Sequence, residues 1–271
     1  MELSVIDDRN AALPPWILDL DGVMWLGDTP VPGSVGAVEE LRRRGRRVLF
    51  VTNNSSSTIA DYLAKFVRIG LTVSADDLCT SAQAAARLIE PGQTALVCAG
   101  PGVTEALTER GIRAVHDLGG TENDPIDAVV VGFHRDFDFE RLRLAHLAVR
   151  RGARLIATND DATYLTPSGP IPGGGAIAAA VSYACGRGPE FAGKPYPASV
   201  KLARERLGFA PDEGSTIVMV GDRPSTDGAF ARALGSRFAL VLSGVTARGD
   251  LPVDPSPDFV ADDLAALVRL G

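Results

Sequence analysis

Two carboxylates lie two residues apart in residues 19–22, which read Asp-Leu-Asp-Gly and come at the end of a predicted strand over residues 16–20. Side chains at positions i and i+2 of an extended segment share one face. Asp19 and Asp21 could therefore divide the roles of nucleophile and acid, or bind one Mg²⁺ together. Gly22 lets a ligand approach the backbone closely. A solvated acidic loop is the alternative, and this motif alone does not decide.

Residues 52–55, Thr-Asn-Asn-Ser, follow a second predicted strand over residues 47–51. A hydroxyl and free backbone N–H groups at a strand-to-helix turn suit an oxyanion or a phosphate. Thr52, Asn53 and Asn54 are therefore candidates for phosphate binding. The alternative is that these residues are N-cap candidates for the helix that follows.

Residues 188–195, Gly-Pro-Glu-Phe-Ala-Gly-Lys-Pro, match the first seven positions of the nucleotide-binding P-loop. A P-loop continues with Ser or Thr, whose hydroxyl binds Mg²⁺, and here Pro195 takes that place. No clear strand is predicted before Gly188. A P-loop is therefore not favoured, and Lys194 stays as a single cation near acidic loops.

A second acid pair lies in residues 221–227, Gly-Asp-Arg-Pro-Ser-Thr-Asp, after a predicted strand over residues 216–220. Asp222 or Asp227 could complete a magnesium site begun by Asp19. The alternative is a helix N-terminus, where Ser and acidic residues are favoured. Taken together, three strand ends that carry acids and a hydroxyl, with a lysine before the third, predict phosphoryl-transfer chemistry.

The elements that must position these residues alternate between β-rich apolar runs and helical patterns, which predicts an α/β fold with a largely parallel sheet. Helices are expected over residues 33–44, 58–69 and 225–234. The middle of the chain, roughly residues 84–189, has strand and helix patterns of its own. From these patterns alone, it could continue the first sheet or form a second domain.

The chain has 271 residues, of which 45% are hydrophobic and 23% charged, as is typical of globular proteins with one or two domains. A net charge of −7 disfavours nucleic acid or an anionic membrane as a partner. Three widely spaced cysteines indicate neither a disulfide framework nor a zinc site. We see no apolar run typical of a membrane span or a secretory signal, so we expect a cytoplasmic protein.

The order and form of the four motifs resemble the haloacid dehalogenase (HAD) superfamily of phosphohydrolases. The second and fourth motifs are similar to the type IIA branch, which includes NagD-like, p-nitrophenylphosphatase-like and phosphoglycolate phosphatase-like enzymes. Three further stretches match that branch: residues 157–161, 172–175 and 242–245. The resemblance implies a doubly wound, Rossmann-like core over residues 1–83 and 190–271. It also implies a C2-type α/β cap domain inserted as residues 84–189.

The resemblance also implies roles for the matching residues. Asp19 is the expected nucleophile, which becomes an aspartyl phosphate. Asp21 is the expected general acid for the leaving alcohol and then the base for the attacking water. The carboxylates of Asp19 and Asp222 and the backbone carbonyl of Asp21 would bind Mg²⁺. Asp227 would support that metal through a water molecule or from behind its ligands, and Lys194 would screen charge between nucleophile and phosphate.

The expected phosphate contacts come from the first two motifs: Gly22, Thr52, Asn53 and Asn54. Substrate selectivity in such enzymes lies in the cap loops, so Asn159 and His134 are the expected substrate contacts there. A solvated histidine is the alternative for His134. The resemblance further implies a homodimer formed through the cap.

These features predict a Mg²⁺-dependent phosphatase that acts on a small phosphorylated metabolite. Glycerol phosphate, phosphoglycolate, a sugar phosphate and p-nitrophenyl phosphate are candidate substrates. A receiver-type signalling module is one alternative, because receivers also combine an acid pair, a phosphoacceptor Asp, a Thr or Ser and a Lys. A P-loop nucleotide binder is the other.

Overall fold

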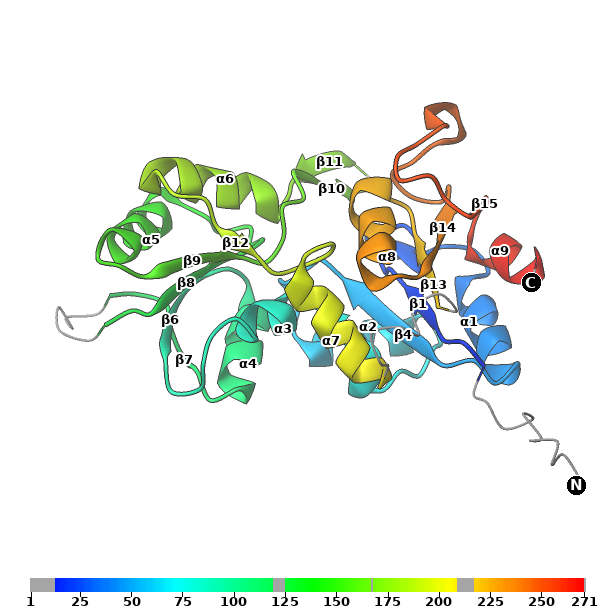
Figure 1. The fold of residues 1–271 in the computed structure, drawn as a ribbon, viewed down its shortest axis with the longest axis horizontal. Helices are drawn as coiled ribbons and strands as arrows, with labels where there is room; N and C mark the ends of the chain where they lie inside the picture. Colours follow the sequence, from blue (N-terminus) through cyan, green and yellow to red (C-terminus); the bar gives the residue numbers. More distant parts are fainter. Residues whose placement is uncertain (1–12, 119–124, 167, 209–216, 271) are drawn as a thin grey trace, which may run out of the picture.

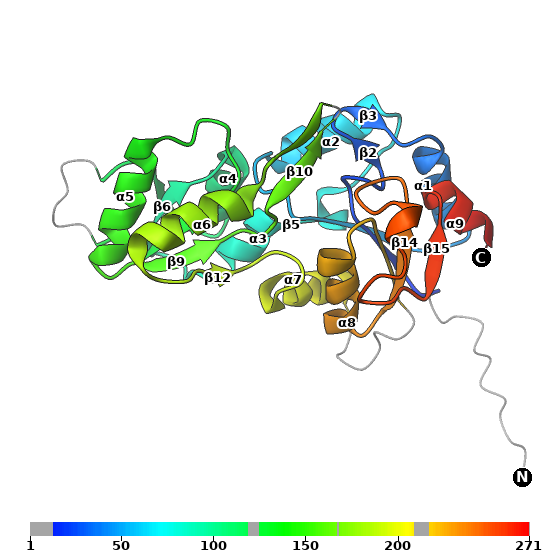
Figure 2. The same ribbon diagram turned by 90° about the horizontal axis from the view of Figure 1, so that it is seen from above.

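The computed structural model describes residues 13–118, 125–166, 168–208 and 217–270 of the chain. Two parallel β-sheets lie next to each other along the long axis of the molecule, each with helices on both faces (Figure 1 and Figure 2). The predicted α/β fold is confirmed.

The first sheet has six parallel strands in the order β15-β14-β13-β1-β4-β5. In chain order they are β1 (Trp16–Leu18), β4 (Val48–Thr52), β5 (Leu78–Thr80), β13 (Val218–Gly221), β14 (Arg237–Val241) and β15 (Phe259–Ala261). Every residue of β1 and β4 is buried, because helices cover both faces, and this explains their continuous apolar sequences. Of the predicted strand 216–220, residue 216 lies outside the described residues.

Helices pack on both faces of the first sheet. One face carries α1 (Ser34–Arg43), α2 (Ile59–Arg68) and α9 (Leu264–Leu270), and the other carries α3 (Ser81–Ala86), α7 (Pro197–Leu207) and α8 (Ala229–Leu234). Strand side chains alternate between these layers, so Leu18 packs on the first set and Ile17 on the second. A capping box between Thr58 and Asp61 begins α2, close to the predicted start.

The second sheet has five parallel strands in the order β12-β9-β8-β6-β7. They are β6 (Thr94–Cys98), β7 (Arg113–Val115), β8 (Ala128–Val131), β9 (Arg154–Ala157) and β12 (Glu190–Phe191). On one face lies α4 (Pro101–Glu109), and on the other lie α5 (Phe139–Arg150) and α6 (Gly174–Cys185). The middle of the chain therefore forms a sheet of its own.

Two antiparallel hairpins and three short helical turns complete the elements of the described residues. The hairpins are β2 (Trp25–Leu26) with β3 (Thr29–Pro30), and β10 (Thr163–Thr166) with β11 (Gly169–Pro172). The turns are η1 (Ala75–Asp77), η3 (Pro224–Gly228) and η4 (Arg248–Asp250). In Figure 2, β10 extends from the side of the second sheet toward the β2–β3 hairpin, which lies beside the first sheet.

The two sheets share one apolar cluster, which includes Leu49 of β4, Ala84 of α3 and Val130 of β8. The segment that forms the second sheet lies between α3 and α7 in the sequence, which is where a cap insertion is expected. Its last strand, β12, ends at Phe191, just past the predicted cap boundary at residue 189. In the described part of the chain, no helix has the length and apolar character needed to cross a bilayer.

Candidate active site

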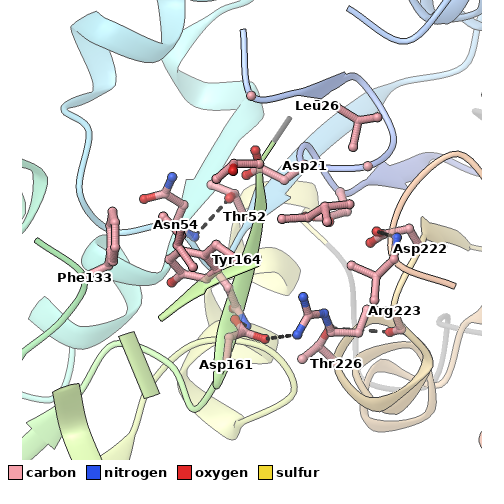
Figure 3. A pocket seen from close by; sticks show the side chains of 18 of the residues that line it. Asp21, Leu26, Thr52, Asn54, Phe133, Asp161, Tyr164, Asp222, Arg223 and Thr226 are labelled. Atoms are coloured by element: carbon pink, nitrogen blue, oxygen red, sulfur yellow. Dashed lines mark hydrogen bonds and ion pairs between the residues drawn. The ribbon is translucent and has the colours of Figure 1, made fainter. Parts of the chain in front are cut away.

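The carboxyl ends of three neighbouring strands bring the predicted motifs together. Strands β13, β1 and β4 are adjacent, so residues 221–227, 19–22 and 52–55 meet at one edge of the first sheet. Lys194 reaches the same edge from the segment between β12 and α7. Figure 3 shows Asp21, Thr52 and Asp222 around the pocket that forms there.

Lys194 is the buried centre of this cluster, with only 2% of its surface exposed. Its Nζ donates hydrogen bonds to Asp19 Oδ1 and Asp227 Oδ1, each at 2.7 Å. Burial disfavours the charged ammonium, but the two carboxylates outweigh that effect and raise the pKa of Lys194 above its usual value. Lys194 is therefore a permanent cation beside Asp19 at neutral pH.

The acids around Lys194 form a compact group. One carboxylate oxygen each from Asp19, Asp222 and Asp227 lies within 4.8 Å of the other two. Burial raises the pKa of Asp19 well above its usual value; the neighbouring carboxylates add to this rise, and Lys194 opposes it. Three carboxylates face one ammonium, so the group has an excess of negative charge that a divalent cation would neutralise.

Two glycines make room for Asp222. A Cβ atom would come within 2.3 Å of Asp222 Oδ2 at Gly22 and within 1.9 Å of the same atom at Gly244. The backbone N–H of Val245 donates to this Oδ2 at 2.6 Å. Burial, with the nearby charge of Asp227, raises the pKa of Asp222 to about 7. The carboxyl is thus held in one position, and a cation beside it would favour its charged form.

Asp21 lines the pocket and is exposed to solvent. Its Oδ1 accepts a hydrogen bond of 3.1 Å from the indole Nε1 of Trp25 in β2. Desolvation by the surrounding protein raises the pKa of Asp21, although Lys65 and Trp25 act in the opposite direction. Water in the pocket limits this rise because the carboxyl keeps contact with solvent. A raised pKa is the property that a carboxylic general acid needs.

The side chain of Asn53 is held by protein groups. Its Oδ1 accepts the backbone N–H of Lys194 at 2.7 Å, and its Nδ2 donates to Lys194 O at 3.1 Å and to Asp161 Oδ2 at 2.9 Å. Both amide protons are therefore used. The sequence interpretation assigned Asn53 to phosphate, whereas in the structure its side chain fixes the backbone of Lys194.

Thr52 and Asn54 line the pocket, as expected for phosphate contacts. The Thr52 hydroxyl is buried and accepts the backbone N–H of Asn54 at 3.1 Å. The Asn54 side chain accepts the backbone N–H of Ser56 at 3.0 Å, which closes the turn after β4. This turn is therefore rigid before any ligand binds.

Asn159 lies behind the pocket rather than in its wall. Its Nδ2 donates to the backbone carbonyl of Asn53 at 2.6 Å and to the Tyr164 hydroxyl at 2.7 Å. Its Oδ1 accepts the backbone N–H of Asp161 at 3.2 Å. The side chain expected to contact substrate thus joins the second sheet to the turn after β4, and Tyr164 faces the pocket in its place.

His134 is buried, so the alternative of a solvated histidine is wrong. Its Nδ1 lies 3.0 Å from Gly132 O, its Nε2 has no hydrogen-bond partner in the described part of the chain, and its ring packs edge-on against Phe137. The pocket is lined instead by the two neighbours of His134, Phe133 and Arg135.

The pocket has a volume of about 230 Å³, which is smaller than the range of roughly 300–1,000 Å³ typical of sites for drug-sized ligands. The β10–β11 hairpin forms its wall on the side of the second sheet. Sequence reasoning missed several lining residues: Lys65, Phe133, Arg135, Asp161, Tyr164 and Arg223. Lys65 and Tyr164 lie in ordinary helix and strand patterns, which give no signal of a site.

An ion pair crosses from one sheet to the other beside the pocket. Arg223 Nη1 lies 3.6 Å from Asp161 Oδ1, and Arg223 Nη2 donates to Thr163 O at 3.2 Å (Figure 3). The sequence contained a signal for both charged residues as site residues, because Asp161 ends a matched stretch and Arg223 follows Asp222. Each was read as part of a motif and not as a site residue.

The P-loop alternative does not fit this geometry. A P-loop follows a strand, whereas β12 lies inside the run 188–195. The Lys194 ammonium binds Asp19 and Asp227 and does not head a helix N-terminus.

Comparisons with known proteins cover nearly the whole chain. A family model described as "haloacid dehalogenase-like hydrolase" matches residues 16–113, and a second HAD-hydrolase-like model matches residues 191–267. The acid sugar phosphatase of Staphylococcus haemolyticus is 34% identical over 253 residues, 92% of this chain and 93% of that protein.

Solved structures of phosphatases also align with this chain. The p-nitrophenyl phosphatase from Archaeoglobus fulgidus aligns with a TM-score of 0.83 and 32% identity, covering 96% of this chain and 100% of that chain. A glycerol phosphate phosphatase from Mycobacterium tuberculosis in complex with magnesium gives a TM-score of 0.83 and 34% identity, over 94% of this chain and 76% of that chain. Both matches span the two sheets. The chain therefore belongs to the haloacid dehalogenase-like hydrolase family.

Proposed function

We propose that this chain hydrolyses small phosphomonoesters with Mg²⁺, through an aspartyl phosphate formed on Asp19. The observation that carries the proposal is the buried Lys194 ammonium held between Asp19 and Asp227, with Asp222 close enough to share a metal. Relatives named for acid sugar phosphates, p-nitrophenyl phosphate and glycerol phosphate support the same reaction class.

The donor set suits Mg²⁺, which prefers carboxylate and carbonyl oxygens. The space that Gly22 and Gly244 leave around Asp222 lets its carboxyl lie at the strand ends. Asp19 and Asp222 would hold the ion with the backbone carbonyl of Asp21, while Asp227, engaged by Lys194, supports it from behind. When bound, Mg²⁺ supplies positive charge that reduces the repulsion between a phosphate and a carboxylate nucleophile.

In the first step, a carboxylate oxygen of Asp19 bonds to phosphorus as the bond from phosphorus to the alcohol oxygen breaks. Asp21 gives its proton to that leaving oxygen. In the second step, Asp21, now a carboxylate, takes a proton from water as the water oxygen bonds to phosphorus. The bond from phosphorus to Asp19 then breaks, which releases inorganic phosphate and returns both acids to their starting states.

The phosphate lies among fixed donors on the core side of the pocket. The Thr52 hydroxyl and the Asn54 side-chain amide, which line the pocket beside Gly22, bind its oxygens, and Lys194 balances its charge. Asn53 acts through Lys194, since its side chain holds that residue's backbone on both sides. The groups are in place before substrate arrives, which lowers the cost of reorganisation during the reaction.

The second sheet serves as a cap over this pocket. We assign residues 84–189 to the cap and residues 1–83 and 190–271 to the catalytic core, with the pairing of β12 favouring a cap that ends at Phe191. The small pocket favours metabolites over phosphoproteins. A net charge of −7 argues against nucleic acid or membrane partners. A cytoplasmic homodimer formed through the cap completes the proposal.

The test is release of phosphate from a panel of small phosphomonoesters, with Mg²⁺ and with EDTA. Metal-dependent release should vanish in Asp19→Asn, whose circular dichroism should match the wild type. Asp262→Asn, which changes an exposed surface acid, is the matched control and should keep full activity. Transfer of ³²P to Asp19→Asn, or undiminished turnover by it, would refute the assignment of the nucleophile.

A further inference from the structure

Three of the four cationic side chains that line the pocket are engaged by protein groups. Lys194 binds Asp19 and Asp227, and Arg223 faces Asp161. Lys65 donates to Gly27 O at 2.6 Å, and its Nζ lies 4.1 Å from the centre of a Trp25 ring. The charge of each is therefore already used within the protein.

Arg135 is the fourth, and its guanidinium has no hydrogen bond, ion pair or ring contact within the described residues. The acids nearest to it in sequence are used elsewhere. Asp136 binds Arg141 at 3.0 Å, and Asp138 caps α5 by accepting the backbone N–H of Arg141 at 2.8 Å. A guanidinium cannot lose its charge at neutral pH, so the pocket holds one uncompensated cation on its cap side.

The segment that carries Arg135 is held firmly against the core. It follows β8, where a Cβ atom at Gly132 would lie only 2.7 Å from Ser55 Oγ in the turn after β4. Phe133 packs edge-on against Tyr164 of the β10–β11 hairpin, with ring centres 5.1 Å apart. Figure 3 shows both rings at the pocket. The backbone that carries Arg135 is therefore held at the wall of the pocket, and its exposed side chain lines the pocket.

We infer that Arg135 recognises a second anionic group on the substrate, so that the preferred substrates are short phosphomonoesters whose carbon skeleton carries a carboxylate. This inference rests on the proposed phosphatase function. The phosphate is bound on the core side by Lys194 and Thr52. Arg135 then faces the other end of the molecule, and its planar donors match a carboxylate with two hydrogen bonds. The pocket volume of about 230 Å³ restricts the skeleton to a few carbons.

A matched pair of esters tests the inference. 3-Phosphoglycerate and glycerol 3-phosphate share a three-carbon skeleton and differ in a carboxylate against a hydroxymethyl group. The wild type should have the higher kcat/KM for 3-phosphoglycerate. In Arg135→Gln the ratio of the two kcat/KM values should fall about 10- to 100-fold, mainly through KM for the carboxylate ester. Arg135→Lys should keep part of the ratio, and Arg150→Gln, at the exposed end of α5, should keep all of it.

Two outcomes overturn the inference and leave the phosphatase intact: a wild-type ratio near one, or the same ratio in Arg135→Gln as in the wild type. If the wild type hydrolyses no ester at all, the proposed function fails. Calorimetry then still decides the role of Arg135. Binding of 3-phosphoglycerate to Asp19→Asn should weaken when Arg135→Gln is added, and an unchanged affinity would refute the contact.

Discussion

Asp222 is the proposed metal ligand whose position depends most on its neighbours, and Gly244 is the closest of them. An added Cβ at Gly244 would lie 1.9 Å from Asp222 Oδ2, so Gly244→Ala must push the carboxyl aside. We expect the Mg²⁺ concentration for half-maximal activity to rise about 10- to 100-fold, as is common when the partner of a metal ligand is changed.

Gly249→Ala is the control for this substitution, since a Cβ there meets nothing within 4 Å. Titration of phosphatase activity with Mg²⁺ makes the comparison. Equal Mg²⁺ requirements in the two variants would show that Asp222 does not need its present position.

Asp222 also makes stability depend on pH. Its pKa is raised from 3.8 to about 7 in the folded protein by burial and by Asp227. Between these values the unfolded chain gives up the proton while the folded protein keeps it, so this group lowers the free energy of unfolding as pH rises from about 4 to about 7. Mg²⁺ binds the carboxylate form and should offset that loss above pH 7.

Chemical denaturation at pH 5 and pH 8, with and without Mg²⁺, measures this effect. We expect Mg²⁺ to stabilise the wild type more at pH 8 than at pH 5. At pH 8, a Mg²⁺ concentration of 100 times its Kd should raise the free energy of unfolding by about 2.7 kcal/mol. Asp222→Asn should lose most of the difference between the two pH values. An equal Mg²⁺ effect at pH 5 and pH 8 would contradict the role of this carboxyl.

At the scale of elements, the strand ends explain why so much of the site could be predicted. Asp19, Thr52 and Asp222 each follow an apolar run that is easy to recognise, and neighbouring parallel strands end at one edge. The pocket wall on the side of the second sheet could not be predicted in the same way. Strand β8 ends at Val131, so no strand pattern extends to the next residues, and the sequence did not indicate that Phe133 and Arg135, rather than His134, face the pocket.

The roles of the two asparagines could not be predicted either, because they depend on contacts between elements far apart in the chain. Asn53 and Lys194 are separated by 141 residues and meet only when the segment after β12 crosses the end of β4. A motif gives the residue type but not the partner. The family resemblance was confirmed, while the partners of Asn53 and Asn159 needed the structure.

Asn53→Ala tests the link between the turn after β4 and the segment that carries Lys194. The change removes the hydrogen bonds to both backbone groups of Lys194 and leaves them buried. We expect a free energy of unfolding lower by about 1–3 kcal/mol and a fall in kcat greater than the rise in KM, because Lys194 acts on charge at the reacting phosphate. Ser56→Ala, in the same turn with its side chain outside the pocket, is the control. A rise in KM alone would instead indicate direct phosphate binding by Asn53.

For the whole molecule, the shared apolar cluster predicts that the two sheets unfold together. It includes Ile17 and Leu49 of the first sheet, Ala85 of α3 between the sheets, and Val97 and Val130 of the second. Separating the two sheets would expose this cluster to water, so neither should unfold while the other stays intact.

The buried cysteines allow this to be measured sheet by sheet. Cys79 lies in β5 and Cys98 in β6, and burial raises the pKa of each thiol to about 12, so neither should react with a thiol reagent in the folded state. Cys185→Ser removes the more accessible thiol, and a second Ser substitution leaves one reporter at a time. Labelling against denaturant concentration should give one midpoint for both reporters, equal to that from circular dichroism. Labelling of Cys98 at a lower denaturant concentration than Cys79 would show instead that the cap opens first and that the shared cluster does not couple the two sheets.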